Sequence, residues 1–138
     1  MSEARIDRSE TEEIAIHYAV AELMRRRWHV GRPPSHRSKG YDLIAARPRK
    51  RAVFVEVKGL QSDGQFIFNG DEWYDPNAEV VADVVIGVRA RPEQPVEFYV
   101  GLAKEIQRDL KARENSEWTP WRRKKQYGDR WDKLGGLE

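Results

Sequence analysis

The feature that most constrains this chain is the run from Ala52 to Lys58, in which apolar and polar side chains alternate. Val53, Val55 and Val57 fall on one side of the alternation, while Glu56 and Lys58 fall on the other. Successive side chains of a strand point to opposite faces of a sheet. The run therefore predicts a strand with one buried face, and it places an acid and an amine next to each other on the opposite face.

The hydrophobic pattern around this strand predicts further helices and strands. Residues 9–28 form a predicted helix, which Ser9 and Glu12 cap and whose apolar stripe consists of Ile16, Val20, Leu23 and Met24. Strands are predicted at 41–45, 65–68, 83–88 and 96–100 and a helix at 102–113, while Pro76 leaves 71–82 undecided. This order predicts an α/β (α+β) fold: a central mixed sheet of four to five strands flanked by helices.

Length and composition limit the class of protein. A chain of 138 residues suits a single domain, 1–138, with a core at about 9–113 and a basic, tryptophan-rich tail at 116–138. The absence of cysteine excludes disulfides and thiolate-bound zinc. No apolar run has the length of a membrane span, and the charged N-terminus does not read as a secretory signal. We therefore expect a cytoplasmic protein with no membrane partner.

Basic residues are clustered although the net charge is only +2. They crowd residues 25–27, 32–39, 47–51 and 122–125, which is compatible with a phosphate-binding surface or with an ordinary solvated one. Trp118, Trp121 and Trp131 stand near the last cluster. They could stack on nucleic-acid bases, but we favour a role in covering the sheet or a dimer partner.

Two carboxylates are predicted to meet beside the strand. If residues 41–45 and 52–58 pair around a turn centred near residue 49, Asp42 lies opposite Glu56. These two side chains and the carbonyl of Val57 would offer oxygen ligands to Mg²⁺ or Mn²⁺. Lys58 would orient an attacking water or offset charge on a phosphate, so the group suits phosphodiester hydrolysis. The alternative is a solvent-facing Glu-x-Lys pair and an aspartate that belongs to a turn.

Gly40-Tyr41-Asp42 and Val55-Glu56-Val57-Lys58-Gly59 resemble the bipartite motif of the PD-(D/E)xK, or restriction-endonuclease-like, nucleases. They look most like Mrr-type enzymes, Holliday-junction resolvases and NO VEIN C-terminal domains, although Tyr41 stands where many members have proline. The resemblance implies a core of helix, three antiparallel strands, helix and strand. It also implies a Mg²⁺-dependent nuclease in which Asp42 and Glu56 bind metal and Lys58 is the catalytic lysine.

Many members of this superfamily also place an acid on the first helix, and Glu10, Glu12 and Glu13 are the candidates here. Helical spacing favours Glu13, because it falls on the predicted apolar stripe and would face the sheet. Glu12 is assigned to the helix cap. The alternative for Glu13 is a surface acid that the helix dipole favours.

The loop before Asp42 is predicted to contact phosphates. Its candidate residues are Arg32, Ser35, Arg37 and Lys39, which would otherwise form a solvated loop. We expect an endonuclease that cuts DNA with Mg²⁺, and a homodimer would suit the cutting of two strands. The alternative function is a catalytically inactive nucleic-acid-binding or protein-interaction domain that retains the nuclease fold.

Overall fold

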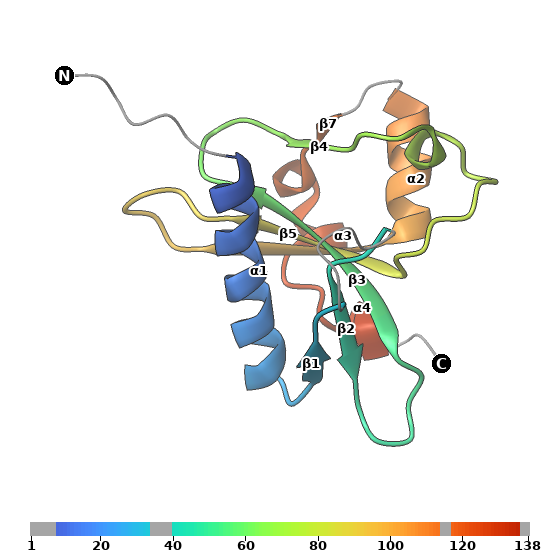
Figure 1. Cartoon of the computed structure of the whole chain (residues 1–138). Coiled ribbons are helices and arrows are strands. Elements are labelled where there is room, and N and C mark those ends of the chain that lie inside the picture. Colours follow the sequence, from blue (N-terminus) through green and yellow to red (C-terminus); the bar gives the residue numbers. More distant parts are fainter. Residues whose placement is uncertain (1–7, 34–39, 114–116, 136–138) are drawn as a thin grey trace.

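A computed structural model describes residues 8–33, 40–113 and 117–135 (Figure 1). Its elements are α1 (Arg8–Arg25), β1 (His29–Gly31), β2 (Leu43–Ala46), β3 (Val53–Leu60), β4 (Phe66–Ile67), the 3₁₀ helix η1 (Asp71–Tyr74), β5 (Val84–Arg89), β6 (Glu97–Leu102), α2 (Ala103–Arg113), β7 (Glu117–Trp118), the 3₁₀ helix η2 (Pro120–Arg123), α3 (Lys124–Tyr127) and α4 (Asp132–Gly135). Among the helices in these ranges, none combines the length and the apolar character that a membrane span requires.

Five strands form a central mixed sheet in the order β1-β2-β3-β5-β6. The pairs β1–β2, β2–β3 and β5–β6 are antiparallel, whereas β3 and β5 run parallel. The α/β fold with a mixed sheet of five strands and the predicted strands at 52–58, 83–88 and 96–100 are thus confirmed, and the last two pair as a hairpin. A parallel pair requires a long connection, and the segment from Gln61 to Asp83 provides it.

Helix α1 packs on the sheet face that carries Val55 and Val57. Its buried stripe consists of Ala15, Ala19 and Leu23, with Ile16 and Val20 partly buried. Met24, predicted to belong to this stripe, is 59% exposed. The alanines mark the contact because small side chains let the helix backbone approach the strand, and a search for large apolar residues misses them.

The opposite face of the sheet is covered by α2 and by the C-terminal segment. Its core contains Phe66, Phe68 and Trp73 together with residues of β5, β6, α2 and the tail. Trp118 is 1% exposed and packs between Phe66 and Tyr127. Trp131 is 6% exposed and contacts Phe98 at the other core. Trp118 and Trp131 therefore cover the sheet, as favoured from the sequence.

Several predicted boundaries were wrong. Ser9 lies inside α1, which begins at Arg8, so it is not the residue before the helix. The helix ends at Arg25 rather than at residue 28, because Arg27 takes a left-handed conformation (φ 73°) and the Trp28 N–H bonds back to the Leu23 carbonyl. The last predicted helix begins at Ala103, since Leu102 still belongs to β6.

The third antiparallel strand is not the predicted one. Residues 65–68, the predicted strand that follows 52–58, contain β4, which pairs with β7 in a separate two-stranded sheet and not with β3. The third antiparallel strand is β1, whose His29 pairs with Ala46 at the sheet edge. The predicted first helix ends at residue 28, and the sequence predicts no strand at 29–31.

Candidate functional site

The register of β2 and β3 brings Asp42 and Glu56 together. Leu43 pairs with Val55, so Asp42, one residue earlier, lies opposite Glu56 as the turn position predicted. The Asp42 N–H also donates to the Val55 carbonyl at 2.8 Å. The two carboxylates therefore come from neighbouring strands at the place where β2 begins.

The backbone of Val57 fixes the Asp42 side chain. Its N–H donates to Asp42 Oδ2 at 2.8 Å. If β2 extended further toward the N-terminus, one of its backbone carbonyls would accept this hydrogen bond instead. The N–H and C=O of one residue point to the same side of a strand. The Val57 carbonyl is therefore directed to the sheet edge at which Asp42 lies, as the proposed ligand set requires.

Lys58 stands beside Glu56 on the face away from α1. Its Nζ lies 3.5 Å from Glu56 Oε1, and both side chains are about one-fifth exposed, at 20% and 19%. The same Nζ lies 4.8 Å from the ring centroid of Phe68, which in turn packs on Trp73. Sequence reasoning missed Phe68 because its contact with Lys58 depends on the fold of the β3–β4 connection.

Burial makes both acids costly to ionise. Burial raises the pKa of Asp42, and the charge of Glu13 adds to the rise. The hydrogen bond from Val57 and the positive charges of Lys58 and Arg32 lower the same pKa but by less. Burial also raises the pKa of Glu56, against Lys58, and the negative charges of Asp42 and Glu72 add to the rise. Two partly buried carboxylates lie side by side here, and the charge of Asp42 raises the pKa of Glu56, so a cation is favoured at this place.

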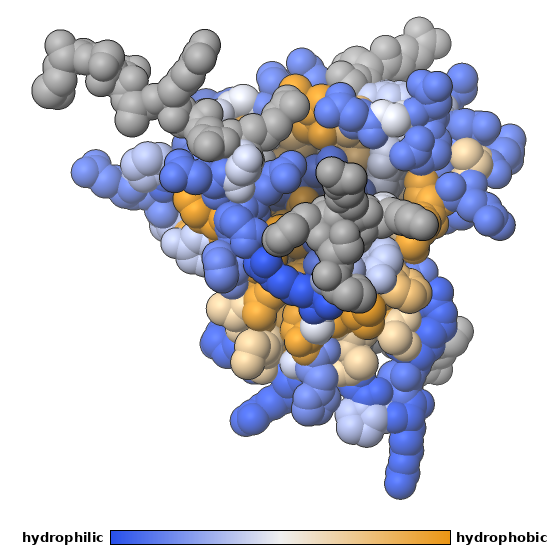
Figure 2. Space-filling model, in the orientation of Figure 1, coloured by the Kyte–Doolittle hydropathy of each residue, from blue (hydrophilic) through white to orange (hydrophobic). Residues whose placement is uncertain are grey.

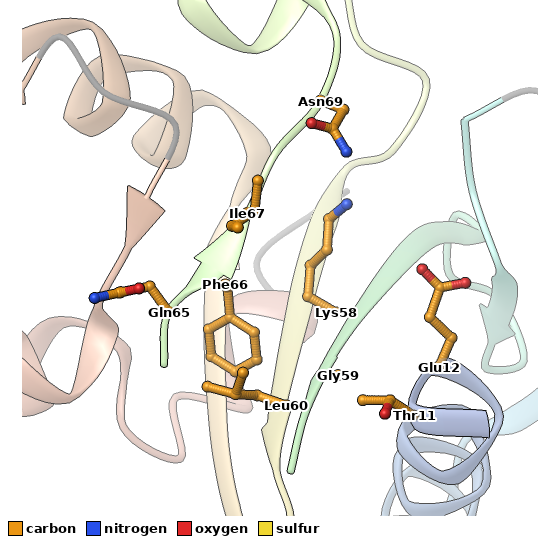
Figure 3. Close-up of a pocket in the computed structure, with 9 residues that line it drawn as sticks. All are labelled: Thr11, Glu12, Lys58, Gly59, Leu60, Gln65, Phe66, Ile67 and Asn69. Atoms are coloured by element: carbon orange, nitrogen blue, oxygen red, sulfur yellow. The ribbon is translucent and has the colours of Figure 1, made fainter. Parts of the chain in front are cut away.

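A pocket of about 310 Å³ adjoins these residues. Its lining comes from α1, from the end of β3 and from the segment after it: Thr11, Glu12, Lys58, Gly59, Leu60, Gln65, Phe66, Ile67 and Asn69. In Figure 3 the Glu12 carboxylate and the Lys58 ammonium extend in the same direction from α1 and β3. Lys58 lines this pocket and also contacts Glu56, so the pocket lies next to the carboxylate pair.

The prediction that Glu13 faces the sheet is wrong. The Glu13 side chain is 50% exposed and accepts hydrogen bonds from both terminal nitrogens of Arg32 at 3.1 Å. Glu12, three and seven residues before the buried Ala15 and Ala19, is the acid of α1 that lines the pocket. Glu12 and not Glu13 lines the pocket because the buried face of α1 is the alanine stripe, which lies at a different angle around the helix from the predicted apolar stripe.

The predicted phosphate-binding loop is only partly within the described ranges. Arg32 is exposed and lies close enough to Asp42 to lower its pKa. Ser35, Arg37 and Lys39 lie outside the residues that the structure describes.

The donor set fits a hard divalent cation. Within residues 8–33, 40–113 and 117–135, no group of three or more His, Cys, Asp or Glu side chains is arranged to bind a metal. Two carboxylates and a backbone carbonyl are nevertheless sufficient protein ligands for Mg²⁺, which keeps several waters and often binds substrate oxygens. Burial raises the pKa of both acids, and a cation bound between them would favour their ionised forms.

Comparison of the whole structure identifies a nuclease fold. The bacterial homing endonuclease I-Ssp6803I superimposes on 74% of this chain and 70% of its own chain, with a TM-score of 0.53 and 18% sequence identity. At that identity the likeness concerns the fold alone. No curated protein sequence matches the chain.

The sequence itself defines the family. Residues 11–80 match the family described as Protein NO VEIN, C-terminal, and this stretch covers half of the chain. The match runs from Thr11 in α1 through β3 to Val80 and includes Asp42, Glu56 and Lys58. The chain belongs to this family, which has a restriction-endonuclease-like fold.

Proposed function

We propose that this chain is a Mg²⁺- or Mn²⁺-dependent endonuclease that hydrolyses phosphodiester bonds in DNA. The observation that carries the proposal is the opposition of Asp42 and Glu56 across the β2–β3 pair, with the Lys58 ammonium 3.5 Å from Glu56. Membership of the NO VEIN C-terminal family and the nuclease fold support it.

Each residue has a defined task in this proposal. Asp42 and Glu56 hold the ion, and the hydrogen bond from Val57 to Oδ2 of Asp42 leaves Oδ1 to bind it. When bound, the ion supplies positive charge for the phosphoryl oxygens and makes a water easier to deprotonate. Lys58, held by Glu56 and Phe68, orients the attacking water or offsets charge on the phosphate. Glu12 lines the path beside Lys58, and Arg32, Ser35, Arg37 and Lys39 contact neighbouring phosphates.

A plasmid-nicking assay tests the proposal. Wild type is compared with Asp42→Asn, Glu56→Gln and Lys58→Ala, each with Mg²⁺ and with EDTA. We expect Mg²⁺-dependent nicking that every one of these variants loses, while circular dichroism and DNA binding persist. Lys111→Ala, an exposed lysine of α2, is the matched control and should cut like wild type. Wild type without Mg²⁺-dependent cutting, or equal cutting by all variants, contradicts the proposal.

Thermal unfolding gives a second readout that does not depend on activity. An ion that binds the folded state at about a hundred times its Kd stabilises that state by about 2.7 kcal/mol. Mg²⁺ should therefore raise the melting temperature of wild type, and EDTA should reverse the rise. Glu56→Gln should show neither effect because it lacks one ligand. An equal rise in wild type and Glu56→Gln would place the ion elsewhere.

Two strands must be cut to break a duplex, and one chain provides one such site. We propose that two copies act together on duplex DNA. Light scattering of the complex with duplex should give the mass of two chains plus one duplex, and a monomer that breaks both strands in one encounter contradicts this.

A further inference from the structure

One end of the molecule carries a concentration of basic residues that the candidate site does not use. Arg25 ends α1 and is followed by Arg26 and Arg27, while the β2–β3 turn contains Arg47, Arg49, Lys50 and Arg51. The pairing of His29 with Ala46 brings these two segments together, and Arg47 Nη2 donates to the Arg26 carbonyl at 2.7 Å. We call these seven residues the basic end. In Figure 1 it lies at the bottom, away from the N-terminal end of α1.

Among the described residues, two carboxylates contact the basic end. Glu22 contacts Arg25 and Arg26, and Asp83 contacts Arg51, so these two acids offset part of its seven positive charges. Hydrophilic side chains project from this end of the surface in Figure 2. Arg47 lies over the Trp28 ring at 4.0 Å and Arg26 over Trp131 at 4.9 Å, so these two guanidinium groups are held in place.

Two of these arginines occupy backbone positions that favour another residue. Arg27 (φ 73°) stands just past the end of α1, where glycine is usual, and Arg49 (φ 64°) occupies a turn. A left-handed conformation costs free energy for any residue with a Cβ, and like charges placed together add repulsion. Glycine would relieve both costs, so arginine at these two positions keeps a positive charge here at the expense of stability.

Strand β3 leads from the basic end past Glu56 to Lys58, the residue proposed to orient the attacking water or meet the phosphate. The seven residue steps from Arg51 to Lys58 span about 23 Å of extended chain. About seven base pairs of duplex cover the same distance, with a phosphate on each strand at every step. We infer that the basic end binds the backbone of the duplex about seven base pairs from the scissile phosphate. This inference rests on the proposed function for the position of the cut.

The inference predicts that the length of the duplex matters. A duplex of 8 base pairs bound at its centre extends too short a distance to reach the basic end, whereas one of 30 base pairs reaches it. The test variant is Arg27→Gln/Arg49→Gln/Lys50→Gln, three exposed positions outside the candidate site. Its matched control, Lys104→Gln/Arg108→Gln/Lys111→Gln, removes the same charge from the exposed face of α2. Both sets are made in the Asp42→Asn background, so that binding is measured without cutting.

Fluorescence anisotropy at several salt concentrations gives the readout. For the 30-base-pair duplex, affinity falls as salt rises. The slope of log affinity against log salt should be shallower by about 2.7 in the test variant than in the parent. Doubling the salt should then weaken the parent about sixfold more than the test variant. The 8-base-pair duplex should show no difference between them, and the α2 control should bind both duplexes like the parent. With Asp42 restored, KM for the long duplex should rise at constant kcat.

Three results overturn the inference. An unchanged slope on the long duplex does so and leaves the proposed function intact, provided that the parent with Asp42 nicks plasmid. An equal loss in the α2 control would show that total charge, not this surface, governs binding. Absence of binding to the long duplex by the parent, with binding to phosphatidylserine vesicles instead, would assign the basic end to a membrane surface. If the protein with Asp42 does not nick plasmid, but DNA binding depends on duplex length and salt as predicted, only the proposed function is contradicted.

Discussion

Gly59 determines how closely α1 approaches the candidate site, and Gly59→Ala tests this. A Cβ built at this position would lie 2.7 Å from the Thr11 carbonyl oxygen and 2.8 Å from Ala15 Cβ. Carbon atoms in contact ordinarily lie about 3.5–4.0 Å apart. Since both neighbours belong to the helix, the first turns of α1 must retreat by about 1 Å.

The expected cost follows from overpacking. Forcing an extra methyl group into a close-packed contact costs about 1–3 kcal/mol, partly offset by up to about 1 kcal/mol because alanine loses less chain entropy than glycine. For a chain of this length a net cost of about 1–2 kcal/mol lowers the melting temperature by roughly 3–8 °C. Activity should fall more than stability, because Thr11 and Glu12, which line the pocket, belong to the displaced turns of α1. A misplacement of about 1 Å can reduce catalysis about a hundredfold.

Circular dichroism melts and Mg²⁺-dependent plasmid nicking at a temperature well below unfolding provide the assay. Gly31→Ala is the control, since an added Cβ meets nothing within 4 Å and Gly31 is exposed. It should melt and cut like wild type. A Gly59→Ala protein with wild-type melting would refute the packing argument. A protein that melts lower but cuts normally would show that the position of α1 does not matter to the site.

Two further predictions concern particular side chains. Phe68→Leu removes the aromatic face under Lys58 but keeps an apolar side chain, so kcat should fall about 2- to 5-fold. Phe68→Tyr keeps the ring and should retain the wild-type kcat. Equal kcat in both variants would exclude a role for the ring. Burial would raise the pKa of Glu97, but hydrogen bonds from Arg89 and Tyr99 lower it to about 2. The stability that this carboxylate contributes is therefore present above its ordinary pKa and is lost as the pH falls toward 2. In urea unfolding below about pH 4.5, wild type should lose more stability than Glu97→Gln, and parallel pH curves would contradict this.

Much of the candidate site could be predicted because it depends on local rules. The alternation of residues 52–58 fixed which side chains share a face, and the turn position fixed the register that sets Asp42 opposite Glu56. Both depend on residues close in sequence. The strand at 83–88 and the helix at 102–113 followed from uniform apolar character and from helical spacing in the same way.

The errors lie where distant parts of the chain decide the structure. Strand β1 has three residues at an edge, too few to show an alternation. Strand β4 pairs with β7 because Phe66 packs against Trp118, which stands some fifty residues later. The prediction that Glu13 faces the sheet failed because the closest contact of α1 uses Ala15 against Gly59, and neither residue counts as a strong hydrophobic signal.

The site exists because β2 stops pairing before β3 does. Strand β3 continues to Leu60 along β5, whereas β2 begins only at Leu43, opposite Val55. Had the chain before Leu43 stayed in the sheet, a backbone carbonyl would have taken the Val57 N–H that Asp42 now accepts. Gly40 takes φ 99°, a conformation that few other residues adopt, and an added Cβ would lie 3.2 Å from Val81 Cβ. The glycine two residues before Asp42 therefore lets the chain leave the sheet there, so the open edge and its carboxylate arise from the same turn.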